Sequence, residues 1–342
     1  MGFAMFWADG VFCGIQIKKF YIKIMDATKS KNAIKTPLKV RAGPAGVHFF
    51  NREIGMNVLI DEFKPPLRLW SKAPRQVSIA LTNSCDLTCP HCYAPKKSAM
   101  LNYDSITHWL TELDANGCLG VGFGGGEPTL YPRLAELCFF VTQRTQLATT
   151  MTTHAHHLSQ NLLKSLEGNL NFVRVSMDGV GKTYEFIRRR SFNQLIDHIV
   201  ALRSIVRFGI NFVVNSRTFS DIDAAIHLAE NLGAAEFLLL PEEPVRGIGG
   251  TDSKTRIALQ EWVLKYPGNI PLSISEAGAE GFPTCNPLSI ETGLSAFAHI
   301  DASGYLKRTS YDETGVQILG GGVMKAIDKL KTKPEVIHEN ME

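Results

Sequence analysis

The chain has 342 residues, 44% of them hydrophobic, so it can bury a sizeable core in one large domain, alone or with a small second domain. Its 36 basic and 33 acidic residues give a formal net charge of +3. This near balance does not point to nucleic acid or a membrane as a partner. No stretch reaches the roughly 18 apolar residues that span a bilayer, and no basic residue precedes the apolar N-terminal run, as it would in a signal peptide.

The cysteines favour a reducing, cytoplasmic location. Of the seven cysteines, three lie between positions 85 and 92 and the others are scattered, unlike the even spacing of a secreted disulfide scaffold. A metal cluster held by thiolates also needs its cysteines to stay reduced. Cys118 and Cys138 lie in apolar patterns, and we expect them to be inert residues of the core.

Residues 1–72 are expected to form an N-terminal preface to the main domain. Residues 47–50 (VHFF) and 57–60 (NVLI) are short apolar runs on either side of the segment NREIGM. Two such runs joined by a short segment that contains glycine form a β-hairpin. The sequence therefore predicts a hairpin that turns at Gly55.

Residues 73–245 alternate between short apolar strands and amphipathic helices. The predicted strands are rich in β-branched residues, as parallel strands covered on both faces are, and lie at 77–81, 120–124, 147–153, 172–177, 210–214 and 236–240. The predicted helices lie at 103–116, 133–144, 161–166, 193–208 and 222–232, and three of them are expected to end at Gly117, Gly209 and Gly233. This repeat predicts an α/β fold, a partial (β/α)6 TIM-like barrel, with functional groups at the carboxyl ends of its strands.

The strand–helix repeat fades in residues 246–342, which are expected to form a small C-terminal α+β extension. Its predicted elements are a helix at 258–266, a strand at 272–275, a hairpin at 297–308 that turns at Ser303 and Gly304, and a helix at 323–330.

Three closely spaced cysteines follow the first predicted strand of the barrel. The segment NSCDLTCPHCYAP places Cys85, Cys89 and Cys92 in a C-x3-C-x2-C spacing, and its prolines favour a loop. Soft thiolates select Fe–S clusters or zinc. Four irons with three protein ligands would leave one iron open to a substrate or cofactor. Zinc stays the alternative, with His91 or a distant residue as its fourth ligand.

A glycine run follows the second predicted strand, where Gly124, Gly125, Gly126 and Glu127 stand in FGGGEP. Glycines at a strand end let the backbone approach a ligand closely. A tight turn between strand and helix is the alternative explanation. A phosphate-binding loop is excluded, because no Gly-Lys-Ser/Thr follows the run.

A hydroxyl and a carboxylate, Ser176 and Asp178, stand at the end of the fourth predicted strand. Alternate residues of a strand face the same side. Both side chains could therefore point into the mouth of the barrel and bind the hydroxyls of a sugar. A Ser-x-Asp at a strand end is also common as a helix cap.

In their order and spacing, these three motifs resemble the radical S-adenosylmethionine superfamily, over about residues 76–244. The resemblance implies a [4Fe–4S] cluster on the three cysteines, S-adenosylmethionine with its amino group on the glycine run, and its ribose on Ser176 and Asp178. It further implies reductive cleavage of that cofactor to a 5′-deoxyadenosyl radical, which abstracts hydrogen from a substrate in the barrel. An electron donor such as flavodoxin or ferredoxin is the expected protein partner.

The sequence departs from the family pattern around the expected adenine site. His91 stands where the family has an aromatic or aliphatic residue, and Tyr93 is expected to take part of that role. Arg188 falls where one branch, which modifies peptides and cofactors, has an arginine near the cofactor carboxylate, and a plain arginine on a helix surface is the alternative. The histidines at 154, 156 and 157 occupy the region where relatives carry Thr-Asn-Gly. They predict no metal site, because no carboxylate is spaced for them in the sequence.

Residues 297–315 resemble the opening hairpin of the SPASM/twitch-like extension in that branch, whose cysteines bind auxiliary clusters. The chain has Lys-Arg-Thr-Ser at 307–310 where the family expects a cysteine, and beyond position 138 it has only Cys285. We therefore expect one cluster and a C-terminal lid or substrate wall. Cys285, in a proline-rich loop, is the candidate donor of a hydrogen atom to a substrate radical, with a plain loop cysteine as the alternative.

Three functions remain open from the sequence. The leading hypothesis is a radical enzyme that modifies a peptide or a peptide-derived cofactor, which the C-terminal resemblance favours. The second is a radical enzyme acting on a small metabolite or nucleoside, which the missing auxiliary-cluster cysteines favour. The third is a non-catalytic Fe–S or zinc binding protein.

Overall fold

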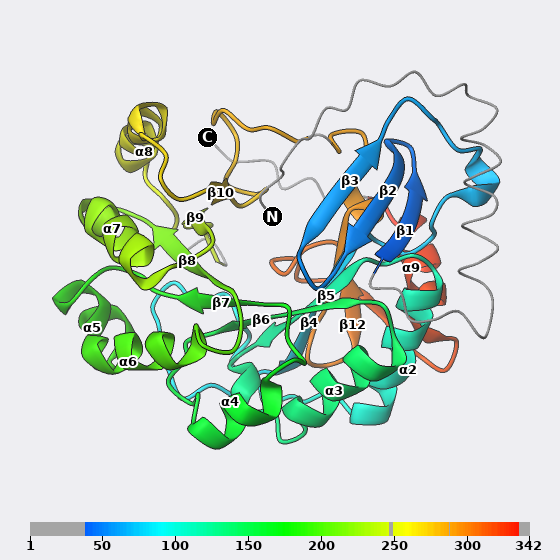
Figure 1. Ribbon diagram of the computed structural model, residues 1–342, viewed down its shortest axis with the longest axis horizontal. Helices are drawn as coiled ribbons and strands as arrows, with labels where there is room; N and C mark the ends of the chain where they lie inside the picture. The colour runs from blue at the N-terminus through cyan, green and yellow to red at the C-terminus, as the bar shows by residue number, and fades with distance from the viewer. Residues whose placement is uncertain (1–37, 246–248, 287, 335–342) are drawn as a thin grey trace.

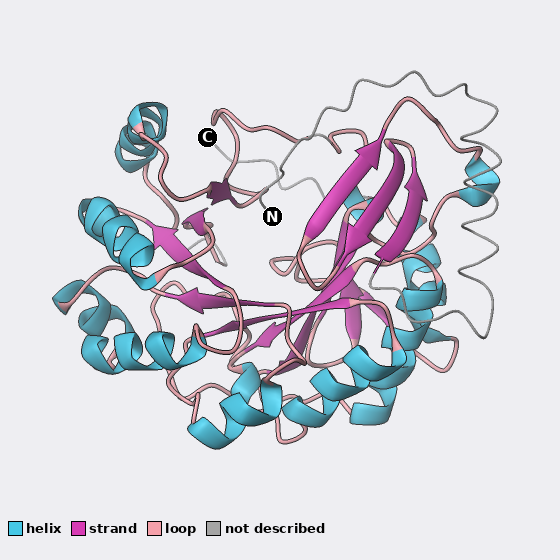
Figure 2. Cartoon of the chain, in the orientation of Figure 1, coloured by secondary structure: helices cyan, strands magenta, loops and turns pink. Residues whose placement is uncertain are grey.

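The computed structural model describes residues 38–245, 249–286 and 288–334. They form a ten-stranded sheet whose convex side is covered by helices, and a separate three-stranded sheet (Figure 1, Figure 2). None of the helices in these residues combines the length and the hydropathy that a membrane crossing requires.

The larger sheet confirms the predicted α/β fold. Its strands are β4 (Gln76–Thr82), β5 (Gly120–Gly125), β6 (Ala148–Thr153), β7 (Phe172–Ser176), β8 (Phe208–Val214), β9 (Phe237–Pro241), β10 (Leu272–Ile274), β11 (Phe297–Ile300), β12 (Tyr305–Lys307) and β13 (Val316–Gln317). The spatial order is β10-β9-β8-β7-β6-β5-β4-β11-β12-β13, and β4 to β9 pair in parallel. Since β10 and β13 are the two edges of this order, the curved sheet is an open barrel.

Helices follow most of the parallel strands. They are α2 (Tyr103–Ala115), α3 (Leu134–Arg144), α4 (Gln160–Leu166), α5 (Lys182–Arg188), α6 (Phe192–Leu202), α7 (Ile222–Leu232), α8 (Ser253–Lys265) and α9 (Gly322–Lys331). Short 3-10 turns lie at Leu67–Leu69, Pro128–Leu130, Phe219–Asp221 and Gly293–Ser295. Asn102 and Ser191 cap the first turns of α2 and α6 with their side-chain oxygens, which fixes where each helix begins.

The two faces of the barrel strands differ in side-chain size and burial. Val77, Ile79 and Leu81 of β4 are fully buried in the core beneath the helices. Successive side chains of a strand point to opposite faces. Met151 and Thr153 of β6 are buried toward the helices, so Thr152 between them faces the concave side. Thr152 is exposed although it lies within a central strand. The concave side is therefore open to solvent.

The predicted hairpin is confirmed, and a further strand extends it. The smaller sheet consists of β1 (Leu38–Gly43), β2 (Gly46–Asn51) and β3 (Met56–Ile60), all antiparallel. Phe50 packs against Leu119 and Ala148, which begin or precede β5 and β6. Arg52, beside it, donates to the carbonyl of Leu147 at 3.1 Å. The small sheet therefore covers the amino ends of the barrel strands, opposite the expected functional edge, while the first part of the predicted preface, residues 1–37, lies outside the described residues.

A buried arginine joins the small sheet to the barrel. The side chain of Arg41 in β1 donates at 2.9 Å to Glu291, to the carbonyl of Ala73 and to that of Gly117. Glu291 also accepts from Arg75 at 2.8 Å. Arg41 is 3% exposed, and a buried charge of this kind is stable only when its hydrogen bonds are made.

The predicted elements of the C-terminal part are present, but they extend the barrel sheet. β10 pairs in parallel with β9, and β11 pairs in parallel with β4, so the sheet runs across the predicted boundary at 245–246. β11 and β12 form the predicted hairpin, and α9 packs on α2. The division into residues 1–72, 73–245 and 246–342 stays a prediction.

One predicted helix end is wrong. The helix expected at 193–208 ends at Leu202, and Gly209 lies inside β8 instead of capping the helix. A Cβ at Gly209 would lie 2.8 Å from the Glu236 side chain and 2.9 Å from Phe172, so this position requires glycine for packing in the barrel. Gly233, by contrast, caps α7 in the left-handed conformation as predicted.

We predict that Arg41→Leu lowers the free energy of unfolding by roughly 3–5 kcal/mol, because it leaves the buried carboxylate of Glu291 short of a partner. Urea unfolding of the purified protein measures this loss. Lys265→Leu is the control, since Lys265 makes an exposed pair with Glu261, and such pairs contribute only about 0–1 kcal/mol. Equal losses in the two variants would contradict the importance assigned to Arg41.

Candidate functional site

The three clustered cysteines lie on one loop that leaves the carboxyl end of β4. The amide of Cys92 donates to the carbonyl of Cys89 at 3.1 Å, which turns the loop back on itself. All three thiols are free, with Cys89 buried and Cys85 and Cys92 partly buried. Lys96 donates to the sulfur of Cys92 at 3.3 Å. The loop thus presents three soft donors together at the functional edge of the barrel.

The glycine run packs backbone to backbone against the start of the cysteine loop. The amide of Gly126 donates to the carbonyl of Thr82 at 2.7 Å. Gly125 has a φ of +119°, and a Cβ on Gly126 would collide with the carbonyl oxygen of Ser84. A Cβ on Gly124, in contrast, would meet no atom within 4 Å. The run is therefore both a tight turn and an open cradle beside Gly124.

The carboxylate of Glu127 is used inside the protein. It is 1% exposed and accepts from the hydroxyl of Thr153 at 2.6 Å, from the amide of His154 at 3.0 Å and from that of Thr129 at 3.1 Å. These bonds join the end of β5 to the end of β6. Only the backbone of the glycine run is left to face a ligand.

Ser176 and Asp178 differ in their surroundings. Ser176 ends β7 and is partly exposed, whereas Asp178 is 1% exposed. One carboxylate oxygen of Asp178 accepts from the amide of Val213 at 3.0 Å. The other pairs with Arg188 of α5 and lies 3.0 Å from Nε2 of His91. Asp178 therefore links the barrel strands, α5 and the cysteine loop.

Charge stabilises this network. Burial by itself would raise the pKa of Asp178, but Arg188 and His91 hold it well below its usual range. Burial would lower the pKa of Arg188, and Asp178 and the Cys89 thiol raise it instead. Burial raises the pKa of the Cys89 thiol, and the nearby charge of Arg188 opposes this shift. Arg188 thus stands between the acidic group and a cysteine of the loop.

A second polar cluster adjoins the first cysteine. The sequence has no carboxylate spaced for the histidines, but the fold brings Asp86 to 3.0 Å from Nε2 of His154 and 3.1 Å from Nε2 of His157. Arg190 pairs with the other oxygen of Asp86 at 2.6 Å. Donor atoms of Cys85, Asp86 and His154 lie within 4.8 Å of one another, so this cluster shares a residue with the cysteine loop and belongs to the same site.

Burial by itself would raise the pKa of Asp86, but Arg190 and His157 hold it well below its usual range. The pKa of His156, in the same loop, falls to about 4, mainly because of burial. His156 lies 2.7 Å from the hydroxyl of buried Tyr184. Asp86 directly follows Cys85 in the chain, and this was the one signal by which sequence could have suggested the cluster.

The C-terminal extension reaches the cysteine loop through a pair of tyrosines. The rings of Tyr93 and Tyr311 are 5.1 Å apart between centroids and tilted by 50°. The Tyr93 hydroxyl also lies near the side chain of Ser310. Tyr93 remains 40% exposed. The segment in which the family expects a cysteine thus packs its polar and aromatic side chains next to Cys92.

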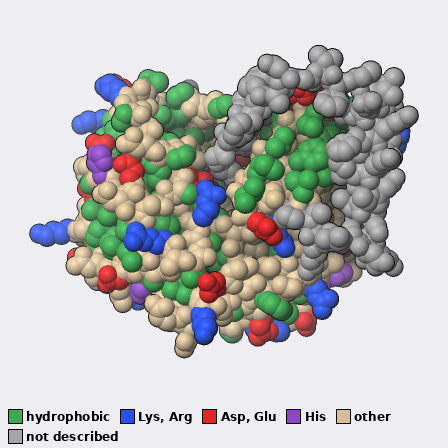
Figure 3. Space-filling model, in the orientation of Figure 1, with side chains coloured by type: hydrophobic (Ala, Val, Ile, Leu, Met, Phe, Trp, Pro, Cys, Tyr) green, Lys and Arg blue, Asp and Glu red, His purple; other side chains and the backbone are tan. Residues whose placement is uncertain are grey.

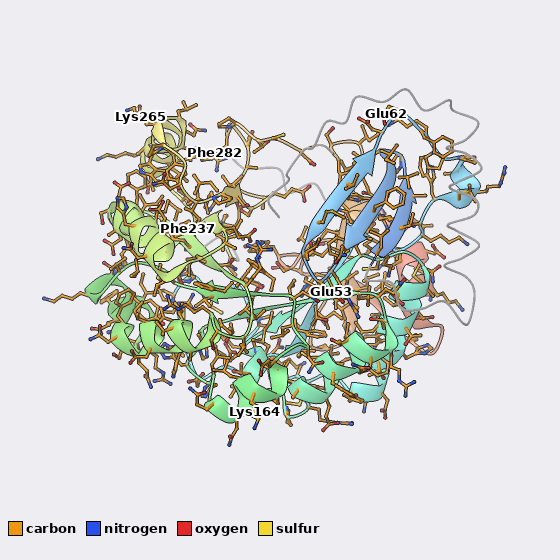
Figure 4. All side chains as sticks on the ribbon, in the orientation of Figure 1. Glu53, Glu62, Lys164, Phe237, Lys265 and Phe282 are labelled. Carbon is orange, nitrogen blue, oxygen red and sulfur yellow. The ribbon has the colours of Figure 1, made fainter. Side chains whose placement is uncertain are left out.

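Cys285 lies in the segment that follows β10, which leaves the sheet at the carboxyl ends of β9 and β10, where Gly278 packs against Pro241. Arg256 of α8 covers the ring of Phe282 at 5.6 Å, and Figure 4 shows Phe282 close to α8. Leu288 borders a small cavity with His48 and Gly120, at the amino ends of the strands. In the chain, Cys285 lies between Phe282 and Leu288, and it is exposed. Its role as a hydrogen-atom donor stays a prediction.

The residues present fit an iron–sulfur cluster with a bound cofactor. Three free thiols on one loop are the donor set of a cluster with one open iron. The open space at Gly124 lies against this loop and gives a ligand access to backbone groups. The fold and site therefore define a class of protein, an open α/β barrel with a three-thiol centre at the carboxyl ends of its strands.

Residues 79–229 match the family model of the Radical SAM superfamily. These residues thus form a radical SAM domain, and relatives named as synthases and cyclases favour an enzyme over the alternative of a non-catalytic binding protein. The cofactors of this domain are a [4Fe–4S] cluster and S-adenosylmethionine, as the sequence predicted.

Similar proteins act on different molecules. The chain is 27% identical to the Fe-coproporphyrin III synthase of Methanosarcina barkeri, over 49% of this chain and 41% of the relative. It is 28% identical to the PqqA peptide cyclase of Gluconobacter oxydans, over 47% of each chain. The structure of Streptococcus suis SuiB bound to its precursor peptide SuiA superposes with a TM-score of 0.65 at 13% identity, over 82% of this chain and 84% of that one. This chain thus spans slightly less than half of the length of each of the first two relatives.

We predict that anaerobically reconstituted protein holds about four irons and four sulfides per chain. Replacing Cys85, Cys89 and Cys92 together with Ala should remove the iron and the brown colour, because no other described thiols are grouped. Cys285→Ala, the change of an exposed cysteine, is the control and should keep both. Iron and sulfide analysis measures the result, and stoichiometric zinc without iron would contradict it.

Proposed function

We propose that the enzyme cleaves S-adenosylmethionine reductively and uses the radical to modify a peptide or a peptide-derived cofactor. One observation carries the first half of this proposal. The buried contacts of Asp178 join the cysteine loop, through His91, to α5, through Arg188. A cofactor that binds a cluster iron and the strand ends at once needs these elements held together.

Each part of the cofactor has residues suited to it. Cys85, Cys89 and Cys92 would hold the cluster, and the backbone of residues 124–126 would receive the methionine amino group. The remaining contacts are assigned to Ser176 and Asp178 for the ribose, Arg188 for the methionine carboxylate and Tyr93 for the adenine. When bound, the cluster supplies one electron to the sulfonium, which yields a 5′-deoxyadenosyl radical and methionine.

The protein's own task is to bind, orient and exclude water. Asp178 stays ionised because Arg188 and His91 compensate its burial. The oxygen that accepts from Val213 can accept a second donor, such as a ribose hydroxyl, since a carboxylate oxygen has two lone pairs. Arg188 can turn part of its guanidinium to a ligand carboxylate, because this planar group has five N–H donors.

The similar proteins support a peptide as the substrate. SuiB was solved with its precursor peptide, and the relative from Gluconobacter oxydans is a peptide cyclase. The open concave side, where Thr152 is exposed, gives a chain segment room to enter. A small metabolite is the second candidate, favoured by the similarity to an Fe-coproporphyrin III synthase and by the absence of a second cysteine cluster from the described residues.

The first test needs no substrate. With dithionite and S-adenosylmethionine, the reconstituted enzyme should slowly release 5′-deoxyadenosine, measured by chromatography. Peptides encoded beside the gene are then added, and the correct one should raise the rate and gain a modification visible by mass spectrometry. Release of 5′-deoxyadenosine that responds to a small metabolite but to no peptide would favour the second candidate.

We predict that Asp178→Asn weakens S-adenosylmethionine binding roughly tenfold to hundredfold, because it deletes a charge-assisted acceptor worth about 1.5–3 kcal/mol. Asparagine keeps the shape of the side chain and can still accept from Val213. Equilibrium binding to the reconstituted protein measures the effect, with the melting temperature as a check on folding. Unchanged affinity would remove Asp178 from the proposed site.

A further inference from the structure

An exposed aromatic ring between two arginines lies on α5, and residues that follow it in the chain contact the cysteine loop. We call Phe186, Arg189 and Arg217 the Phe186 patch. Phe186 of α5 is 47% exposed, and its ring centroid lies 4.7 Å from Cζ of Arg189 and 4.4 Å from Cζ of Arg217. Basic side chains project from the surface over α5 in Figure 3. The cofactor contacts proposed above use none of these three residues.

The backbone under this patch is strained. Arg189 has a φ of +55°, in the left-handed region, where it caps the end of α5. This position usually holds glycine or asparagine, since other residues lose about 1 kcal/mol or more there. The arginine is thus kept at a conformational cost, and it places a cation on the ring of Phe186. A strained residue of this kind indicates a functional constraint.

The neighbours of Arg189 connect the patch to the cysteine loop. Arg190 pairs at 2.6 Å with Asp86, which directly follows Cys85. The guanidinium of Arg188 lies close to the thiol of Cys89. Arg189 of the patch thus stands in the chain between two residues that contact the cysteine loop.

The reaction requires an electron that another molecule supplies. Besides the three cysteines of the loop, the described residues contain Cys118 and Cys138, both buried in the core, and Cys285, which is exposed. These three form no group that could hold a second cluster in residues 38–245, 249–286 and 288–334. Each electron must then pass directly from a reduced carrier to the one cluster, so that the carrier is oxidised and the cluster reduced by one electron.

We propose that the Phe186 patch docks an acidic one-electron carrier protein of the flavodoxin or ferredoxin type. This inference rests on the proposed function, which requires the electron. Two arginines complement an acidic surface and speed encounter, and aromatic residues and arginines are enriched among the anchors of protein interfaces. Docking at this place would serve electron transfer, because Arg188 and Arg190 connect the patch to the cysteine loop.

An acidic substrate peptide would also be attracted to arginines. The contacts of the patch lead to the cysteine loop, whereas a substrate has to reach the concave side of the barrel, where Thr152 is exposed. The observations therefore favour the electron carrier, and the peptide becomes one outcome of the test.

The test compares two routes of electron supply to the reconstituted enzyme. The variants are Phe186→Ala and the pair Arg189→Gln with Arg217→Gln. The matched control is Arg144→Gln with Lys164→Gln, which removes two charges from α3 and α4; Figure 4 shows Lys164 on the outer helical side. For each protein, flavodoxin binding is measured at low and high salt, and 5′-deoxyadenosine release is measured with reduced flavodoxin and with dithionite.

We expect both patch variants to bind flavodoxin about tenfold more weakly, as for the loss of interface anchors, and the wild type to lose affinity with salt. Release driven by flavodoxin should fall, and release driven by dithionite should stay unchanged. Affinity equal to that of the control would overturn the proposal. Equal loss with dithionite would do so too, because the patch would then act on the site itself.

Two further outcomes separate the hypotheses. Normal flavodoxin binding with impaired modification of an acidic peptide would assign the patch to the substrate and end the docking proposal. No release from the wild type with dithionite, despite a loaded cluster and weakened flavodoxin binding by the variants, would sink the proposed function while the docking surface stands.

Discussion

The buried carboxylate of Asp178 is the interaction on which the arrangement of the site depends. A buried charge is tolerated only when charged and hydrogen-bonding partners surround it. These partners are Arg188 of α5, His91 of the cysteine loop and the backbone of Val213 in β8. Each comes from a different part of the chain, so the charge draws a loop without regular structure into a fixed position against the strand ends. The same network explains why His91 can replace an apolar residue between two cysteines.

Two buried charges thus hold opposite ends of one barrel. Arg41 fixes the small sheet to the amino ends of the strands, through Glu291 and backbone carbonyls. At the other end, Asp178 fixes the loops that carry the candidate cofactor site. Between them, Gly122 and Thr152 on the concave side are partly or fully exposed. The hydrophobic core lies on the convex side, beneath the helices.

The strands β4 to β9 and the residues of the three motifs could be read from the sequence, because local apolar patterns and short spacings determine them. Contacts between segments that are distant in the chain could not be predicted in this way. Gly209 looked like a helix cap, but neighbouring strands make it a packing residue. Asp86 and His154 meet only when two loops of the barrel converge, and the contact of Tyr93 with Tyr311 depends on the fold of the C-terminal part. Such pairs leave no periodic signal in the sequence.

The pairing of β4 with β11 affects how the chain reaches its native state. Gln76 lies opposite Phe297, so the strand that leads into the cysteine loop completes one side of its ladder only when nearly the whole chain is available. Contacts of such large sequence separation form slowly, and an unpaired strand edge is prone to wrong association meanwhile. During synthesis, this edge of β4 can therefore be paired only after the C-terminal hairpin has been made.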